Sequence, residues 1–251
     1  YGAKGRAIGQ AGLGNRKDIR NAVEAAVKAS AWGSATAHNR AQILYYIAEN
    51  LDARSADFAA RLTQWHGDAA TAQREVEQSI KTLFTYAAWA DKYDGAVHAT
   101  PMRNVTLAMH EPIGVIGIVA PDHQPLLASV TLMSAAISMG NAVVLTPSER
   151  MPLALTDFYQ VLDTSDVPSG VVNIITGARD ALSKTLAEHN EVDAMWYFGD
   201  PEGCAMVERA SVGNLKRTWT SAKRIDFGAL DVRAVLRHAT QVKNIWVPYG
   251  V

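Results

Sequence analysis

The chain has 251 residues, 48% of them hydrophobic and 20% charged, so it can bury a sizeable core in one large domain or two small ones. Its 24 Lys and Arg residues nearly cancel its 25 Asp and Glu residues without forming a basic block, which argues against nucleic-acid binding. No stretch approaches the roughly 18 uninterrupted apolar residues of a membrane helix. A single cysteine, Cys204, rules out an internal disulfide and indicates a reducing, cytoplasmic compartment.

Residues 1–96 are expected to form an N-terminal helical layer, because their apolar residues recur at a helical spacing. Thr36 stands where it would cap the second of these helices. Such stripes belong to a packed core far more often than to a ligand site. The four stripes are Ile19, Ala22, Val23, Ala26 and Val27; Ile43, Leu44, Ile47, Ala48 and Leu51; Phe58, Leu62 and Trp65; and Val76, Ile80, Leu83, Phe84 and Ala87.

A different period begins after residue 96. Residues 105–110 alternate, which predicts a strand with one face less buried than the other. Pro101 is tolerated at the start or edge of such a strand. The two faces carry Val105, Leu107 and Met109, and Thr106, Ala108 and His110.

Between residues 111 and 220, short apolar runs alternate with amphipathic segments. Near-continuous apolar strands separated by helices predict βαβ units and a parallel sheet that is covered on both faces. Such a sheet binds ligands at the carboxyl ends of its strands. The expected strands are 113–119, 142–146, 171–175, 194–198 and 216–220, and the expected helices lie near 126–139, 152–163, 180–189 and 202–211.

The tail of the chain breaks this rhythm. A polar stretch, 221–226, leads to a short helix near 230–240, and residues 242–248 alternate as a final strand. A strand that leaves a doubly wound domain needs an edge with which to pair. We therefore expect 221–240 to be a linker and helix that leads to a paired strand.

Several long motifs follow one another in the second half of the chain. They are EPIGVIGIV at 111–119 with PDHQP at 121–125, GNAVVLTPSE at 140–149, PSGVVNIITG at 168–177 and NLKR at 214–217. Their order and spacing resemble the aldehyde dehydrogenase superfamily across roughly residues 5–220. QVKNIWV at 241–247 is similar to the last oligomerisation strand of that family. Several motifs in the right order make the resemblance specific.

The resemblance implies an α/β fold with a Rossmann-like parallel five-stranded sheet over 111–220, flanked by helices. It adds the helical layer and a small β oligomerisation arm built from 97–110 and 241–251. Members of the family oxidise aldehydes with NAD, in a catalytic domain that follows the cofactor domain. Here the NLKR motif leads to the tail within about two dozen residues, so 221–240 is expected to replace the catalytic domain.

No catalytic residue is expected, although two weak candidates stand out. The family attacks aldehydes with a cysteine thiolate, and Cys204 lies in a helical segment where a small buried side chain is the favoured interpretation. His123 stands where the family has an oxyanion-donating asparagine, but an exposed polar loop is favoured there. The general-base glutamate of the family falls at about Ser221, which cannot act as a base.

The ribose-binding run of the family, Lys-Pro-Ser-Glu, has lost its lysine. It is matched here by Thr146, Pro147, Ser148 and Glu149. Glu149 could still accept hydrogen bonds from ribose hydroxyls, which would favour NAD over a 2′-phosphate carrier. The favoured alternative is a helix cap or first turn made by Ser148 and Glu149.

The pyrophosphate-binding run of the family, Phe-Thr-Gly-Ser at the start of a helix, is also altered. It is matched here by Phe198-Gly199-Asp200-Pro201. Asp200 would place a negative charge beside a phosphate, at a cost of about 1 kcal/mol, and Pro201 removes an N–H donor. The pair suits an N-cap and first helical residue instead. We therefore expect no cofactor for this chain, and no metal.

The favoured hypothesis is a non-catalytic domain that acts in assembly, resembling the truncated C-terminal domain of tandem, duplicated aldehyde dehydrogenases. The expected partner is a second copy, as in a dimer, or a catalytic aldehyde dehydrogenase domain, bound through 97–110 and 242–248. Two alternatives stay open: an active NAD(P)-dependent aldehyde dehydrogenase, and a nucleotide-binding sensor without chemistry. A start at Tyr1 rather than Met is compatible with a piece of a longer protein.

Overall fold

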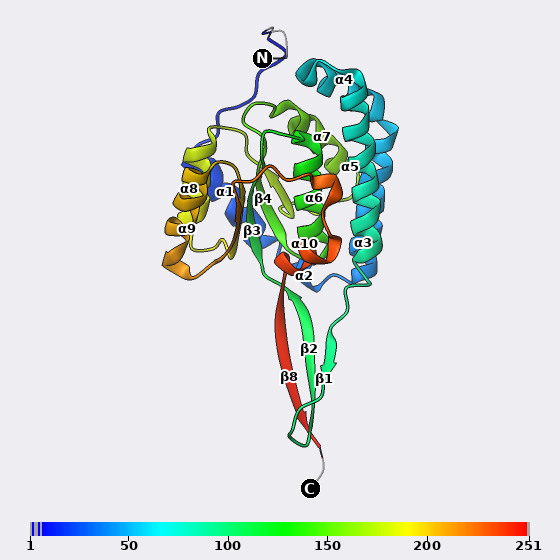
Figure 1. The fold of residues 1–251 in the computed structure, drawn as a ribbon, viewed down its shortest axis with the longest axis vertical. Helices are drawn as coiled ribbons and strands as arrows, with labels where there is room; N and C mark the ends of the chain where they lie inside the picture. The colour runs from blue at the N-terminus through cyan, green and yellow to red at the C-terminus, as the bar shows by residue number, and fades with distance from the viewer. Residues whose placement is uncertain (1, 3–4, 6, 250–251) are drawn as a thin grey trace.

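A parallel five-stranded sheet lies at the centre of the computed structural model, which describes residues 2, 5 and 7–249 (Figure 1). Its strand order is β5-β4-β3-β6-β7, so the order reverses at β3. The α/β fold with a five-stranded parallel sheet expected from the sequence is confirmed. The strands are β3 (Val115–Val119), β4 (Ala142–Thr146), β5 (Val172–Ile174), β6 (Ala194–Phe198) and β7 (Arg217–Ser221).

Helices cover both faces of this sheet, which explains why every residue of β3, β4 and β6 is buried. On one face lie α1 (Arg16–Lys28), α8 (Arg179–Glu188) and α9 (Pro201–Ala210). On the other face, α6 (Pro125–Ser138) buries all its residues, as a helix that is apolar on every side must. The chain reaches α3 from α1 through the short helix α2 (Ala31–Ser34).

Four further helices enclose α6 on that second face. They are α3 (Ala37–Ala53), α4 (Ser55–His66), α5 (Ala69–Trp89) and α7 (Leu153–Asp163). The predicted cap at Thr36 is confirmed, because its hydroxyl accepts from the Asn39 N–H at 3.1 Å. The N-terminal segment contributes to both helical layers rather than to one, since α1 packs against α8 and β4. Residues 1, 3, 4 and 6 of that expected layer lie outside the described residues.

A three-stranded antiparallel sheet projects from one end of the body and forms the arm in Figure 1. It consists of β1 (Ala96–His98), β2 (Asn104–Pro112) and β8 (Thr240–Pro248), in the order β1-β2-β8. The two strands expected from the sequence pair with each other, from Asn104 opposite Pro248 to Pro112 opposite Thr240. Residues 250 and 251 of the expected arm lie outside the described residues.

The segment between β7 and β8 returns the chain to the arm. After β7 it crosses the carboxyl ends of the strands, forms a 3-10 turn at Phe227–Ala229 and continues as α10 (Val232–His238). Helix α10 packs against α6 and β8. A second 3-10 turn, Ser211–Asn214, precedes β7. Across the described residues, no helix combines the length and apolar character needed to cross a membrane.

Candidate functional site

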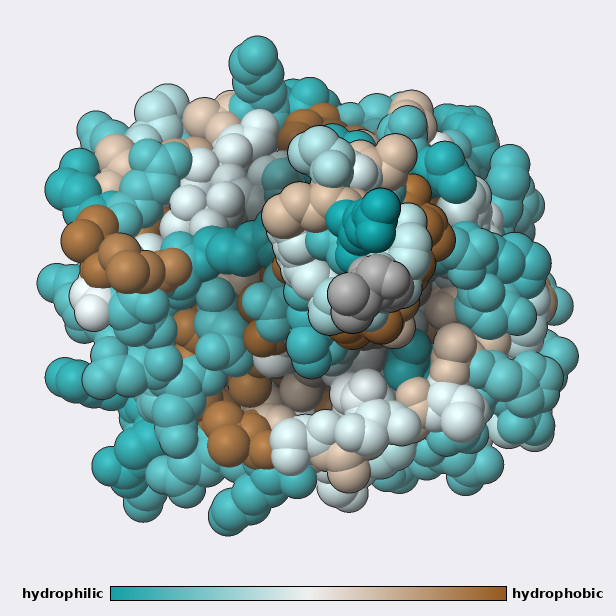
Figure 2. Space-filling view, turned by 90° about the horizontal axis from the view of Figure 1, so that it is seen from below, coloured by the Kyte–Doolittle hydropathy of each residue, from teal (hydrophilic) through white to brown (hydrophobic). Residues whose placement is uncertain are grey.

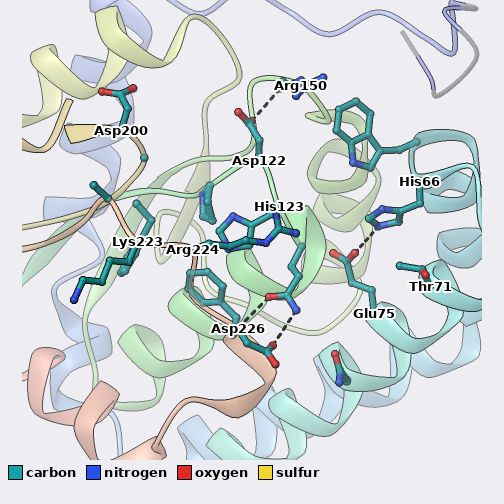
Figure 3. Close-up of a pocket in the computed structure, with 18 of the residues that line it drawn as sticks. His66, Thr71, Glu75, Asp122, His123, Arg150, Asp200, Lys223, Arg224 and Asp226 are labelled. Atoms are coloured by element: carbon teal, nitrogen blue, oxygen red, sulfur yellow. Dashed lines mark hydrogen bonds and ion pairs between the residues drawn. The ribbon is translucent and has the colours of Figure 1, made fainter. Parts of the chain in front are cut away.

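A cleft of about 830 Å³ opens at the carboxyl ends of β3, β6 and β7. Its walls are the segments 121–124, 198–200 and 222–227, together with side chains from α4 and α5 on the far side (Figure 3). The cleft lies where the strand order reverses, the usual position of a ligand site in an open α/β sheet.

One wall of the cleft is built around Glu75, a carboxylate on α5 that is only 4% exposed. Its Oε1 accepts hydrogen bonds from the backbone N–H groups of Leu126 and Leu127, at 2.9 and 3.2 Å. Its Oε2 lies 2.7 Å from His66 Nε2. Glu75 therefore caps the N-terminus of α6 from another helix, and the positive end of the helix dipole stabilises the buried negative charge.

The loop after β3 clamps the segment that follows β7. His123 Nε2 lies 2.8 Å from the backbone oxygen of Ile225, and because a carbonyl can only accept, that nitrogen donates. Gln124, with a left-handed backbone at φ 49°, donates to Asp226 Oδ1 at 3.0 Å and accepts from Phe227 N–H at 3.0 Å. The loop at 121–125, expected to be exposed, is half-buried because segment 222–227 lies across it.

Asp122 points away from His123 and contacts Ser148 and Arg179 instead (Figure 3). Its Oδ1 accepts from the Ser148 hydroxyl at 2.7 Å and forms an ion pair with Arg179 Nη2 at 2.8 Å. Ser148 is buried, and its hydroxyl accepts from Met151 N–H at 3.0 Å, so it closes a turn before α7 rather than capping α7 itself. These contacts tie the ends of β3 and β4 to the start of α8.

The N-terminus of α9 is capped by its own sequence, as the Asp-Pro pair predicts. Asp200 Oδ1 accepts from Gly203 N–H at 2.7 Å, and Pro201 is the first helical residue. Tyr197 lies beneath this end: a Cβ on Gly199 would lie 2.6 Å from its hydroxyl. Burial, helped by the Asp200 carboxylate, raises the pKa of Tyr197 to about 12, so the phenol stays neutral.

A carboxylate also occupies the N-terminus of α8. Glu149 is exposed, and its Oε2 accepts from the backbone N–H of Arg179 at 3.1 Å. Ser148 and Glu149, expected to form a helix cap or first turn, therefore act at two places: Ser148 closes the turn before α7, and Glu149 binds the first amide of α8. At both helix ends that face the strand ends, a negative side chain already binds an amide that a phosphate would need.

Cys204 lies on α9 and is not among the residues that line the cleft. Desolvation, helped by the carboxylates of Glu208 and Asp200, raises the pKa of its thiol. A thiol with a raised pKa is protonated at neutral pH and is a poor nucleophile. The structure thus places His123 in the cleft and leaves Cys204 outside it.

The sequence profile of the aldehyde dehydrogenase family matches residues 2–222. The chain belongs to the aldehyde dehydrogenase family. It is 33% identical over 223 residues to the cytosolic 10-formyltetrahydrofolate dehydrogenase of Xenopus tropicalis, a match that covers 85% of this chain and 25% of that protein. An aldehyde dehydrogenase of Agaricus bisporus is 33% identical over 220 residues, covering 85% of this chain and 44% of its own length.

Solved structures agree with this assignment. PnpE from Pseudomonas sp. WBC-3 in complex with nicotinamide adenine dinucleotide superposes with a TM-score of 0.83 at 26% identity, covering 86% of this chain and 45% of PnpE. An NAD-dependent aldehyde dehydrogenase from Sinorhizobium meliloti gives 0.79 at 26% identity, covering 83% and 42%. The chain therefore spans less than half the length of these aldehyde dehydrogenases.

For a member of the aldehyde dehydrogenase family, the helix ends are a poor match to a dinucleotide. A pyrophosphate at α9 would meet the Asp200 carboxylate and the ring of Pro201, and the amide of Gly203 is already bound. The residues present do not fit that group in the manner implied by the family resemblance. Thr146 and Pro147 are buried, which leaves Glu149 as the exposed member of the ribose-type run.

Two residues that shape the cleft escaped the sequence analysis, namely Glu75 and Arg179. Glu75 falls within the buried stripe of α5, between Ala72 and Ser79. An acidic residue inside an apolar stripe is the signal that could have identified it, because a buried carboxylate needs a partner. Nothing in the sequence pairs Arg179 with Asp122, since they are 57 positions apart with four elements between them.

Proposed function

We propose that this chain is a non-catalytic aldehyde dehydrogenase domain that acts in assembly and gives structural support to an NAD-dependent aldehyde dehydrogenase. Its partner is a second copy of the chain or a catalytic aldehyde dehydrogenase domain, bound through strands 97–110 and 242–248. The observation that carries this proposal is the arm, a separate sheet that projects from the body and leaves large apolar side chains exposed to solvent.

The apolar face of the arm is defined by strand register. Val105 stands opposite Val247, and Leu107 stands between Val97 and Ile245, so these side chains share one face with Met109. Val97 is 72% exposed, Met109 47% and Val247 48%. Hydrophobic residues show along the flank of the arm in Figure 2, which looks at the molecule from the arm's end. Exposed apolar residues on a projecting sheet are typical of a protein interface.

The outer edge of β8 adds main-chain hydrogen-bonding capacity to this face. β8 is an edge strand, since the order of the arm is β1-β2-β8. An edge strand offers N–H and C=O groups to a strand of a partner. Only residues 223–239 separate the end of the family match from β8. This short connection supports the view that β8 completes the arm without a catalytic domain inserted before it.

Two further observations support a lack of catalysis. His123 donates to Ile225, so it is engaged in a structural contact where the resemblance places an oxyanion donor. The raised pKa of Cys204 leaves no activated thiolate. We also propose a cytoplasmic location, because the 10-formyltetrahydrofolate dehydrogenases that this chain resembles are named as cytosolic.

The test is the molecular mass in solution, measured by light scattering for the chain alone and mixed with a full-length aldehyde dehydrogenase from its own organism. Val105→Lys combined with Val247→Lys should abolish association, because two charges would be buried in an apolar interface. Asn244→Lys is the matched control, since Asn244 lies on the opposite face of β8 and should leave the mass unchanged. A monomer in both samples, or association that survives the double substitution, would refute the proposal.

A nucleotide-binding module without chemistry is the second candidate. Three buried polar atoms near the strand ends have no partner among the described residues: Thr146 Oγ1, Arg179 Nε and the Tyr197 hydroxyl. Buried groups of this kind are satisfied by ligand or water. Calorimetric titration with NAD, NADP and ATP tests this candidate, and submillimolar binding would favour it. Asp200→Ser should strengthen NAD binding if the Asp200 carboxylate is what opposes the pyrophosphate.

A further inference from the structure

A second pocket, of about 580 Å³, lies at the base of the arm and is separate from the cleft at the strand ends. Its walls come from the segment between α5 and β1, from β2, from the start of β7, and from α10 and β8. These elements are distant in the sequence and meet only in the folded chain. The ionisable side chains considered below are Arg217, Arg233, Arg237, His110 and Asp94.

Three arginines line this pocket. Arg233 and Arg237 are four residues apart on α10, so they lie on one face of that helix. The guanidinium of Arg233 lies over the ring of Trp89, 5.2 Å from its centroid, and Arg217 Nη1 donates to the backbone oxygen of Thr240. These contacts hold two of the guanidinium groups while leaving most of their five N–H donors unused.

The charge in this pocket is not balanced by the protein. Among the described residues, none of the three arginines belongs to an ion pair. Asp94 is the one acidic side chain in the lining, so three positive charges and one negative charge leave a net charge of +2. Positive groups gathered around one concavity repel one another and attract anions.

A neighbouring histidine lies within reach of the same positive charges. His238, on α10, stacks on Trp219 with ring centroids 4.0 Å apart. Its pKa is lowered, first by burial and then by the charges of Arg217 and Arg237. Both arginines therefore act on the same small region from different elements.

His110, another residue of the lining, carries an unsatisfied polar atom. Its ring stacks on Tyr93 at a centroid distance of 4.3 Å, and its Nδ1 is buried without a hydrogen-bond partner among the described residues. A buried polar atom left unpaired costs free energy, which a ligand in the pocket would recover. In one tautomer Nδ1 donates, as an anion requires.

We propose that this pocket binds a small dianion, either a phosphate group or a dicarboxylate, held between Arg217 and the Arg233–Arg237 pair. Guanidinium groups bind both anions through paired, charge-assisted hydrogen bonds. The balance of charge differs from that of the cleft, whose lining holds four acidic and five basic side chains, whereas here three arginines face one acid. This proposal does not depend on the assembly function or on the nucleotide alternative.

Isothermal titration of the full chain with inorganic phosphate and, separately, with succinate tests this site and distinguishes the two kinds of dianion. Arg233→Gln combined with Arg237→Gln should weaken the preferred anion at least tenfold, because each charged hydrogen bond contributes that much or more. Arg224→Gln is the matched control: it removes an exposed arginine from the cleft and should leave the affinity unchanged. Circular dichroism of each variant checks that the fold is retained.

Histidine NMR locates the anion. The preferred anion should shift the ring signals of His110 and His238 in the unsubstituted chain and not in the double variant. The proposal is refuted if neither anion binds at millimolar concentration, if the double substitution leaves binding unchanged, or if Arg224→Gln removes it.

Discussion

The two sheets of this protein are built from similar strands but differ in what covers them. β3, β4 and β6 are buried along their whole length between two helical layers. In the arm, β1 is exposed throughout and β8 is buried only at its first residue, Thr240. The same kind of apolar residue is therefore core in one sheet and surface in the other.

This difference separates two sources of stability. The central sheet gains from apolar area removed from water, at about 25 cal/mol per Å². The arm gains mainly from main-chain pairing between β2 and β8, and a small sheet with one uncovered face is only marginally stable by itself. Such an arm becomes fully stable when its apolar face is covered, whereas the central sheet is already covered on both faces.

The largest expected contrast is between one substitution in each sheet. Ile118→Ala in β3 removes a fully buried side chain and should lower the free energy of unfolding by about 2–5 kcal/mol. Val105→Ala in β2 removes a side chain that is 39% exposed and should cost less than about 1 kcal/mol in dilute solution. Urea denaturation measures both values.

Protein concentration sharpens this contrast. If the arm is covered in an assembly, the cost of Val105→Ala should grow as the concentration rises, whereas the cost of Ile118→Ala should not. Equal costs for the two substitutions in dilute solution would show that the arm is not the weaker sheet.

The next effect concerns the buried carboxylate that joins two helices of the body. Glu75→Ala leaves the N–H groups of Leu126 and Leu127 buried without their acceptor, so it should cost about 2–4 kcal/mol. Glu77→Ala, two residues along on the exposed side of α5, should change stability by no more than about 0.5 kcal/mol. Thermal unfolding of both variants compares them, and similar losses would contradict the capping role.

The smallest effect is a dependence on pH at the junction of body and arm. The pKa of His238 is lowered below 6.5 in the folded chain, so the unfolded chain binds its proton at a higher pH. Stability should therefore fall as pH decreases from about 7 to about 5. His238→Gln should flatten this slope and His38→Gln, on the surface, should not; urea midpoints at several pH values measure it. The pKa of His189 is also lowered, so part of this dependence of stability on pH should remain in the His238→Gln variant.

Most of the fold could be predicted from the sequence, because the spacing of the apolar residues agrees with the burial of the helices and strands they form. Continuous apolar runs identified the central strands, and the alternation at 105–110 identified β2. The alternation did not show which face is buried. Thr106 and Ala108 are buried although Val105 and Met109, on the other face of β2, are exposed. Trp246 stands opposite Thr106 on the face that is buried.

The site was less predictable, because its contacts join distant segments. The cap made by Asp200 is local, because it binds the amide of Gly203 only three residues away, and the Asp-Pro pattern was sufficient to predict it. His123, Glu149 and Glu75 each bind a backbone group at least 30 residues away. Neither periodicity nor spacing specifies such partners: the loop at 121–125 is half-buried rather than exposed, and Ser148 and Glu149 bind the amides of two separate segments.

The pairing of β2 with β8 also constrains how the chain is made. Partners in this ladder lie far apart in the sequence, as with Asn104 and Pro248. A ribosome must therefore release the chain through Pro248 before β2 gains its full neighbour, and contacts of such long range form slowly. Throughout that interval β2 exposes an edge able to pair with another nascent chain, so the arm is where misassembly would begin if synthesis stalled.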